Sequence, residues 1–144
     1  MDPETVMPPT STPFGDRVAR RLRDERIIWL TTVGADGTPQ PNPVWFLWDG
    51  DTFLIYSLPH AARIANIRRN PRVSLNLDGN GRGGDIVVIT GDAHLRPDER
   101  PADQMPAYVE KYKDYIEGSF GTPANFAAQY SVPIRITPTK VRGG

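Results

Sequence analysis

Apolar and polar residues alternate over short stretches along most of the chain, and this pattern predicts a protein made mainly of β-strands. Residues 72–77 alternate strictly, while residues 26–33 are rich in β-branched and aromatic side chains. Both patterns are typical of strands that bury at least one face. By the same criteria, the sequence predicts strands over residues 26–33, 38–48, 52–57, 72–77, 85–95 and 132–137.

Glycine and proline mark the places where these strands turn or bend. Residues 34–37 include two glycines that accept a positive φ, which predicts a hairpin. Gly91 lies inside a long strand pattern and is predicted to form a bulge that bends the strand around a barrel. Prolines cannot donate to a strand ladder, so the first half of residues 38–48 is predicted to be an edge or a bulged segment. The prolines concerned are Pro39, Pro41 and Pro43.

A second periodicity, of three to four residues, predicts short helices. Phe14, Val18 and Leu22 recur on one face of a helix over residues 14–24. Further helices are predicted over residues 61–69, 101–117 and 123–130, with a break at residues 118–121. The last of them has Thr122 as its predicted N-cap. Because hairpins rather than helices connect most of the strands, the pattern favours an antiparallel β-barrel with peripheral helices.

Composition and length suggest one domain preceded by a flexible arm. Residues 1–13 combine four prolines with small polar residues, and such a segment cannot bury enough apolar surface to order itself. The chain of 144 residues is long enough for one hydrophobic core and too short for two. We therefore expect a flexible arm over residues 1–13 and a single barrel domain over residues 14–144.

Charge and composition argue against several classes of partner. Seventeen basic residues balance seventeen acidic ones, so the chain lacks the broad positive field that favours nucleic acid. No apolar run approaches the ~20 residues that cross a bilayer, and no secretion signal precedes the domain, so we expect a cytoplasmic protein without a membrane partner. The chain has no cysteine, and His60 and His94 lack carboxylates at ligand spacing, so no metal site is expected.

One candidate site lies where the predicted third strand gives way to a helix. The strand ends at Ser57, and Arg63 falls in the first turn of the helix that follows. Free backbone N–H groups and the helix dipole favour an anion at such a terminus, while a guanidinium can clasp a phosphate with two hydrogen bonds. The alternative interpretation fits the same residues equally well. In it, the serine only caps the helix, the arginine lies on the surface, and no ligand binds.

A second candidate segment covers residues 39–48. Its prolines leave carbonyl groups and a few amides unpaired along one edge, and a planar heteroaromatic ring could pair with them. Trp45 offers aromatic surface beside that edge. The structural alternative is a bulged strand whose tryptophans fill the core, which is the commoner use of this residue.

Taken together and in this order, the two segments resemble the split β-barrel flavin and deazaflavin oxidoreductases, the broad family of pyridoxamine phosphate oxidases. The resemblance is greatest to the actinobacterial branch that uses coenzyme F420, a deazaflavin. It covers residues 18–142 and is strongest over residues 34–39, 42–46, 57–73 and 132–142. The resemblance implies an antiparallel, FMN-binding-like split barrel that forms a homodimer, with the cofactor in grooves between the subunits.

The resemblance also implies which residues hold the cofactor. Those beside the ring are Asn42, Pro43, Val44, Trp45 and Phe46. Those around the phosphate are Tyr56, Ser57, His60, Ala61, Ala62 and Arg63. The family more often has lysine where this chain has arginine, and the exchange keeps the charge and gains a bidentate geometry. No catalytic acid–base residue is identified.

Departures from the pyridoxamine phosphate oxidases favour F420 over FMN. Asn42 and Leu47 stand where those enzymes have an arginine and a phosphate-binding lysine. We therefore expect an F420-dependent oxidoreductase that transfers hydride between the deazaflavin and a small conjugated organic acceptor. The alternatives are an FMN-binding oxidoreductase of the pyridoxamine 5'-phosphate oxidase type and a non-enzymatic cofactor carrier. The tyrosines and Phe120 near residues 108–120 could shape an acceptor pocket, although a core-facing stripe explains them more simply.

Overall fold

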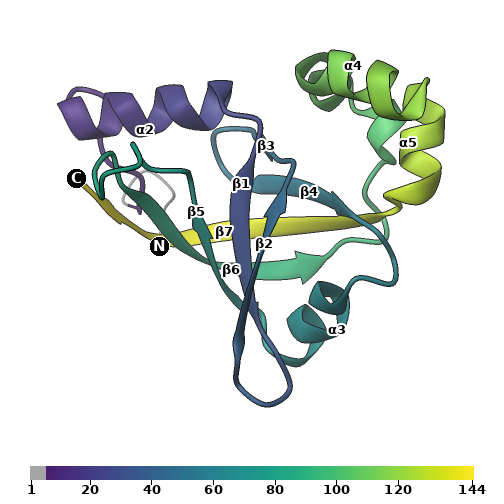
Figure 1. The fold of residues 1–144 in the computed structure, drawn as a ribbon, viewed down its shortest axis with the longest axis horizontal. Helices are drawn as coiled ribbons and strands as arrows, with labels where there is room; N and C mark the ends of the chain where they lie inside the picture. The colour runs from purple at the N-terminus through teal and green to yellow at the C-terminus, as the bar shows by residue number, and fades with distance from the viewer. Residues whose placement is uncertain (1–5) are drawn as a thin grey trace.

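The centre of the protein is one strongly curved sheet, seen in a computed structural model that describes residues 6–144 (Figure 1). The strands are β1 (Ile28–Val33), β2 (Pro39–Val44), β3 (Leu47–Trp48), β4 (Phe53–Ser57), β5 (Arg72–Asn76), β6 (Val87–Leu95) and β7 (Val132–Gly143). The seven strands lie in the order β2-β1-β5-β6-β7-β4-β3, and all neighbours are antiparallel. The predicted fold class, an antiparallel split barrel with peripheral helices, is confirmed.

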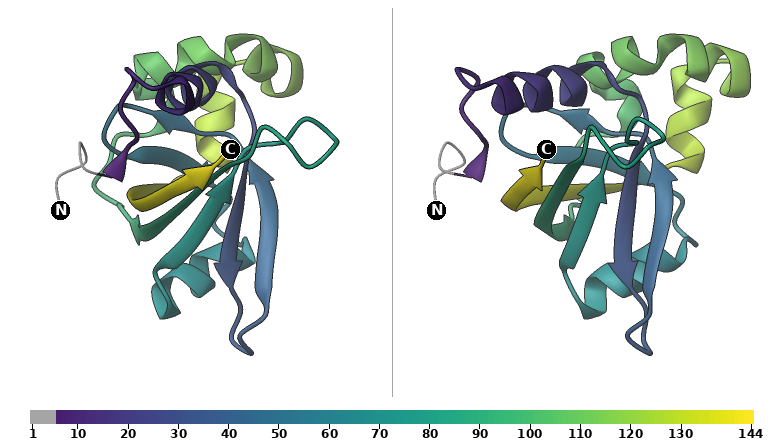
Figure 2. Two further views of the ribbon diagram at one scale, coloured as in Figure 1. Left: turned by 90° about the vertical axis from the view of Figure 1, so that its left-hand side faces the viewer. Right: turned by 60° about the vertical axis from the view of Figure 1, so that its left-hand side comes forward.

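The helices cover the ends of this curled sheet. They are α2 (Pro13–Asp24), α3 (Ala62–Arg69), α4 (Pro106–Phe120) and α5 (Pro123–Gln129), with a short 3₁₀ turn, η1 (Ala102–Gln104), before α4. Helix α2 lies at one end, and α4 and α5 pack together away from it; α3 sits at the opposite, lower end of the sheet in the views of Figures 1 and 2. Within residues 6–144, no helix is both long enough and apolar enough to span a bilayer.

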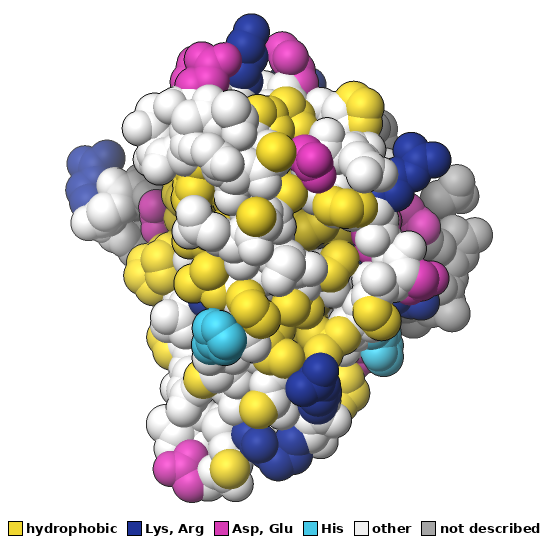
Figure 3. Space-filling view, turned by 90° about the vertical axis from the view of Figure 1, so that its right-hand side faces the viewer, with side chains coloured by type: hydrophobic (Ala, Val, Ile, Leu, Met, Phe, Trp, Pro, Cys, Tyr) yellow, Lys and Arg dark blue, Asp and Glu magenta, His cyan; other side chains and the backbone are white. Residues whose placement is uncertain are grey.

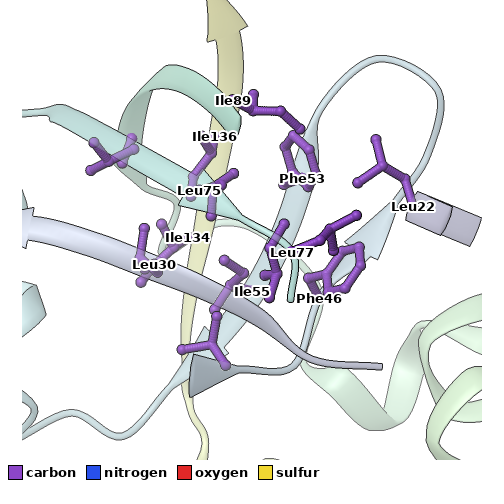
Figure 4. Close-up of a cluster of buried hydrophobic side chains, with 14 of the residues drawn as sticks. Leu22, Leu30, Phe46, Phe53, Ile55, Leu75, Leu77, Ile89, Ile134 and Ile136 are labelled. Atoms are coloured by element: carbon purple, nitrogen blue, oxygen red, sulfur yellow. The ribbon is translucent and has the colours of Figure 1, made fainter. Parts of the chain in front are cut away.

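Strand β4 separates two hydrophobic clusters because successive side chains of a strand point to opposite faces. All five of its residues are buried. Phe53 and Ile55 point into the barrel core, where they join Phe46, Leu75, Ile89, Ile136 and other buried apolar residues (Figure 4). Leu54 and Tyr56 point the other way, into an aromatic cluster formed with Tyr108, Tyr112 and Phe126 of α4 and α5.

The segment predicted as one strand over residues 38–48 forms two strands, which lie at opposite edges of the sheet. Strand β2 pairs with β1 at one edge, as its prolines indicate, whereas β3 pairs with β4 at the other edge. Only Trp45 and Phe46 join the two. This two-residue segment, which we call the seam, therefore connects the two edges of the curled sheet. The prediction of one continuous strand was wrong. It arose because the apolar residues on both sides of the seam follow a single pattern.

Other boundaries differ where pairing or packing outweighs the local pattern. Strand β7 was predicted to end near residue 137 but continues to Gly143, because the long β6 supplies a ladder for its polar half. The register shift at Gly91 confirms the predicted bulge. Helix α4 runs through Gly118 to Phe120 and ends at Gly121, which has a φ of 82°. The break predicted over residues 118–121 therefore falls at Gly121 and not at Gly118.

The segment before α2 makes contacts that the sequence pattern does not indicate. Residues 1–5 of the predicted flexible arm lie outside the described residues. Met7 packs against the barrel core, and the Thr12 hydroxyl caps α2 by accepting a hydrogen bond from the Gly15 N–H at 3.0 Å. Helix α2 itself buries Val18 and Leu22, two of the three residues on its predicted apolar face.

Candidate functional site

A pocket of about 220 Å³ lies where the seam, the β4–α3 connection and helices α4 and α5 meet. Six of the residues expected at the cofactor line it: Pro43, Val44, Trp45, Tyr56, Ala61 and Arg63. The rest of its wall is Leu58, Tyr108, Phe120, Phe126 and Tyr130. Figure 3 looks onto the right-hand side of Figure 1, where apolar side chains form a band down the face and Lys and Arg side chains gather at its lower end.

Arg63 brings a positive charge to this apolar pocket. Its Nη1 donates a hydrogen bond to the Ser57 Oγ at 2.9 Å, and that hydroxyl donates to the Leu58 carbonyl at 3.0 Å. Burial lowers the pKa of Arg63, since a half-buried guanidinium loses hydration. Within residues 6–144, no carboxylate forms an ion pair with Arg63. The guanidinium keeps donors free for an anion at the pocket.

The start of α3 adds backbone donors to the same region. Ala61 is the N-cap residue and has no side chain that could accept a hydrogen bond. The first N–H groups of the helix therefore lack a side-chain cap, and they favour an anion together with the helix dipole. Ser57 supports Arg63 and does not cap the helix, so the capping alternative from the sequence is wrong. Arg63 itself is half-buried, which a surface arginine beside a capped helix would not be.

A buried network fixes α3 against the β1–β2 hairpin. Asn66 is 5% exposed, and its Nδ2 donates to the Thr32 Oγ1 at 3.0 Å and to the Gln40 Oε1 at 2.9 Å. Arg69 donates back to the Asn66 Oδ1 at 2.8 Å. Asn66 was not expected from the sequence, where an asparagine between apolar helix positions carries no distinctive signal. The network sets where α3, and with it Arg63, lies relative to β1 and β2.

Two neighbouring residues of α4 hold the seam. The Phe46 N–H donates to the Tyr112 hydroxyl at 2.7 Å, and that hydroxyl lies 2.7 Å from the Arg26 carbonyl and 2.9 Å from the Phe46 carbonyl. Lys111 Nζ donates to the Phe46 carbonyl at 2.9 Å. Both backbone groups of Phe46 are thus paired by side chains, as buried backbone groups require. Sequence reasoning missed Lys111 because nothing local distinguishes it from a solvated helix lysine.

Trp45 is held by stacking on both helices. Its ring stacks on Tyr112 with centroids 4.6 Å apart and an interplanar angle of 5°. It also stacks on Phe126 at 5.1 Å and 15°. Part of the indole surface is therefore used in packing, as the structural alternative anticipated, while the residue still lines the pocket.

Five of the expected site residues do not line the pocket. Ser57 is fully buried behind it and contacts Arg63. Asn42 is exposed on the edge strand β2, and His60 and Ala62 are exposed in the connection to α3 and at its start. The Phe46 side chain is fully buried in the barrel core, so only its backbone belongs to the seam. Within the described part of the chain, no group of three or more His, Asp and Glu residues could hold a metal ion.

The curled antiparallel sheet and the pocket beside its seam define a split β-barrel of the kind that binds flavin-type cofactors. A model of the pyridoxamine 5'-phosphate oxidase family matches residues 14–143, and the chain belongs to that flavin-binding family. The family includes oxidoreductases. A search of the curated proteins finds no match to this chain.

Solved structures agree with this assignment. A proposed pyridoxamine 5'-phosphate oxidase from Listeria innocua is 26% identical, with a TM-score of 0.64 over 88% of this chain and 94% of that one. An F420 reductase is 25% identical, with a TM-score of 0.65 over 85% and 94% of the two chains. The heme storage protein HutZ from Vibrio cholerae shares the fold at 16% identity, with a TM-score of 0.60 over 88% and 92%.

Proposed function

We propose that this protein binds coenzyme F420 in the pocket beside the seam and catalyses hydride transfer between the deazaflavin and a small conjugated organic acceptor. The observation that carries the proposal is Arg63, whose charge is half-buried at an apolar, aromatic pocket without a carboxylate partner among residues 6–144. The 25% identity between this chain and an F420 reductase of the same fold supports the choice of cofactor. So does the absence of the phosphate-binding lysine expected in pyridoxamine phosphate oxidases, since Leu47 stands there.

The residues present fit such a cofactor. Arg63 and the first N–H groups of α3 would hold its phosphate, with Ser57 orienting the guanidinium. Pro43 and Trp45 would lie beside the ring, and Phe120 and Phe126 exclude water from the same space. When bound, the deazaflavin supplies the hydride chemistry, so the protein needs to bind, orient and shield.

The pocket is small for the whole cofactor, which supports a homodimer. Its volume of about 220 Å³ falls below the roughly 300–1,000 Å³ of most small-molecule sites. One chain therefore encloses only part of a ligand as large as F420. In the proposed homodimer, the cofactor lies at the subunit interface, and the partner covers the apolar band seen in Figure 3.

Titration of the purified chain with F420 and with FMN tests the proposal. We expect F420 to bind more tightly, and Arg63→Ala to weaken F420 binding by about tenfold to a hundredfold, because a charge-assisted hydrogen bond contributes about 1.5–3 kcal/mol. Arg63→Lys should retain part of the affinity. Arg68→Ala, on the exposed end of the same helix, is the matched control and should bind as the original chain does. Equal dissociation constants for the original chain and Arg63→Ala would refute the phosphate assignment.

The second candidate is an FMN-dependent oxidoreductase, which the 26% identity to the Listeria innocua protein favours. A yellow purified protein with flavin absorbance would support it, whereas a colourless protein that binds added F420 supports the main proposal. A non-enzymatic carrier is the third candidate. The ionisable groups on the pocket wall are Arg63 and three tyrosines, none of which is an obvious proton donor near neutral pH. Tight binding without turnover of any conjugated acceptor would favour the carrier.

A further inference from the structure

One hydroxyl group at the pocket has no partner within the protein. Tyr108 of α4 lines the pocket, its exposed fraction is 0%, and no atom of residues 6–144 forms a hydrogen bond with its hydroxyl. The other two buried tyrosines are paired. The Tyr56 hydroxyl donates to the Arg100 carbonyl at 2.7 Å, and Tyr112 pairs with the backbone of the seam.

A buried hydroxyl without a partner is costly, so the hydroxyl of Tyr108 is not explained by packing. Leaving such a group unpaired costs about 1–3 kcal/mol, and phenylalanine would fill the same space without this cost. The other side chains with unpaired buried atoms in the described residues are Arg17 and Asp85. They form an ion pair with each other at 3.0 Å, so Tyr108 differs from both.

The surroundings of Tyr108 fix its ring and leave the pocket side adjustable. Its ring packs edge-on against Tyr56 at 5.0 Å, and also against Tyr112 at 5.0 Å and Phe126 at 5.9 Å. Phe120 and Tyr130 complete the wall and are only half-buried. A ligand that displaces one of these two side chains can therefore go deeper into the pocket, whose wall includes Tyr108.

Burial also keeps the Tyr108 hydroxyl in its donor form. Desolvation, with smaller effects from the neighbouring tyrosines, raises the pKa of Tyr108 well above its ordinary value. A phenol with a raised pKa releases its proton reluctantly, which argues against a role as general acid. It remains a good hydrogen-bond donor to a neutral oxygen.

We propose that Tyr108 donates a hydrogen bond to a carbonyl oxygen of the bound cofactor's ring, and so selects a planar heteroaromatic ring with a carbonyl at its edge. This inference rests on the proposed function, because the acceptor is a carbonyl group of the proposed cofactor. Deazaflavin and flavin rings both carry such carbonyl groups. Arg63 and Tyr108 line the same pocket, so one ligand would meet an anion contact at the first and a neutral donor at the second.

The test compares Tyr108→Phe with the original full-length chain by titration with F420. We expect the dissociation constant to rise about tenfold, because a hydrogen bond made only in the complex is lost. Without ligand, the urea midpoint should stay the same or rise, because no internal partner loses its bond. The carbonyl stretching frequency of bound F420 should rise in the variant, which a purely structural role would not produce.

Two further variants serve as controls. Tyr115→Phe, on the same helix but 41% exposed, should change neither affinity nor stability. Tyr112→Phe should lower the urea midpoint, because it unpairs the seam. An unchanged dissociation constant in Tyr108→Phe would overturn the Tyr108 assignment alone, and so would a lowered midpoint of the free variant. If the original chain binds neither F420 nor FMN, the proposed function and the assigned acceptor of the Tyr108 hydrogen bond are both overturned.

Discussion

At the scale of single residues, Lys111 shows how a charge can be drawn into an apolar site by one backbone group. Its Nζ lies 2.9 Å from the Phe46 carbonyl oxygen and 3.7 Å from the centre of the Phe46 ring. Burial, and then the neighbouring charge of Arg26, lower the pKa of Lys111 from 10.5 to about 8. The hydrogen bond of Lys111 therefore stabilises the seam, while the burial of its charge lowers the free energy of unfolding.

The lowered pKa predicts a pH dependence of stability. Below pH 8, Lys111 is protonated in both the folded and the unfolded chain. Above pH 8, the unfolded chain retains a proton that the folded chain releases, so the free energy of unfolding rises with pH. We expect the original chain to gain about 1 kcal/mol relative to Lys111→Met between pH 8 and 9.5, after allowance for partial exposure. Urea denaturation of both proteins at a series of pH values measures this gain.

The comparison with Lys111→Met should stop below pH 10. Burial raises the pKa of Tyr56 to about 12, so ionisation of that tyrosine in the unfolded chain lowers stability at higher pH. A difference that stays constant from pH 6.5 to 9.5 would show that Lys111 has an ordinary pKa.

At the scale of elements, two glycines that look alike in the sequence have opposite roles. A Cβ at Gly91, in the bulge of β6, would lie 2.7 Å from the Thr137 carbonyl oxygen and 2.9 Å from the Ile136 Cγ2. A Cβ at Gly118, in α4, would have no atom within 4 Å. The sequence indicates the bulge correctly, because an isolated glycine in a strand is a recognised signal, but it reads Gly118 wrongly as a helix break.

Matched alanine substitutions test this difference. We expect Gly91→Ala to lower the free energy of unfolding by about 1–3 kcal/mol, because β7 cannot move away without breaking its ladder. Gly118→Ala should raise it by about 0.5–1 kcal/mol, because alanine loses less conformational entropy in a helix. Urea midpoints of the two variants, measured side by side, decide the matter. Equal changes would contradict the close approach of β6 and β7.

At the scale of the whole molecule, the seam explains why the pocket lies where it does. The two edge strands β2 and β3 are joined only by Trp45 and Phe46, so the seam is where the sheet opens toward α4 and α5. The apolar band on this face and the small pocket both favour a second subunit against it.

The proposed homodimer predicts a definite mass in solution. A chain of 16.0 kDa should sediment at about twice that mass, and the dimer should persist when F420 is removed if the apolar band is the interface. Sedimentation velocity with and without F420 measures both. A single species of the monomer mass at micromolar concentration would contradict the proposed interface, whatever the cofactor affinity.

Much of the fold follows from local patterns. The alternation of residues 72–77, the Thr122 cap of α5 and the prolines of β2 each act within a few residues, and the elements that they predict exist. Part of the candidate site was also predictable, since Arg63 and Ser57 follow a strand–turn–helix pattern. Lys111, Asn66 and Tyr130 were not, because their roles depend on partners more than twenty residues away or on another helix.

The sequence by itself determined an antiparallel barrel, its turns, the bulge at Gly91 and the positive charge at the start of α3. Those features depend on backbone preferences and on period, which are local. Only the tertiary structure decided that one apparent strand divides between opposite sheet edges, that Arg63 is half-buried, and that Tyr108 is buried without a partner. Burial and pairing arise when distant segments meet, and no short-range pattern encodes which segments those are.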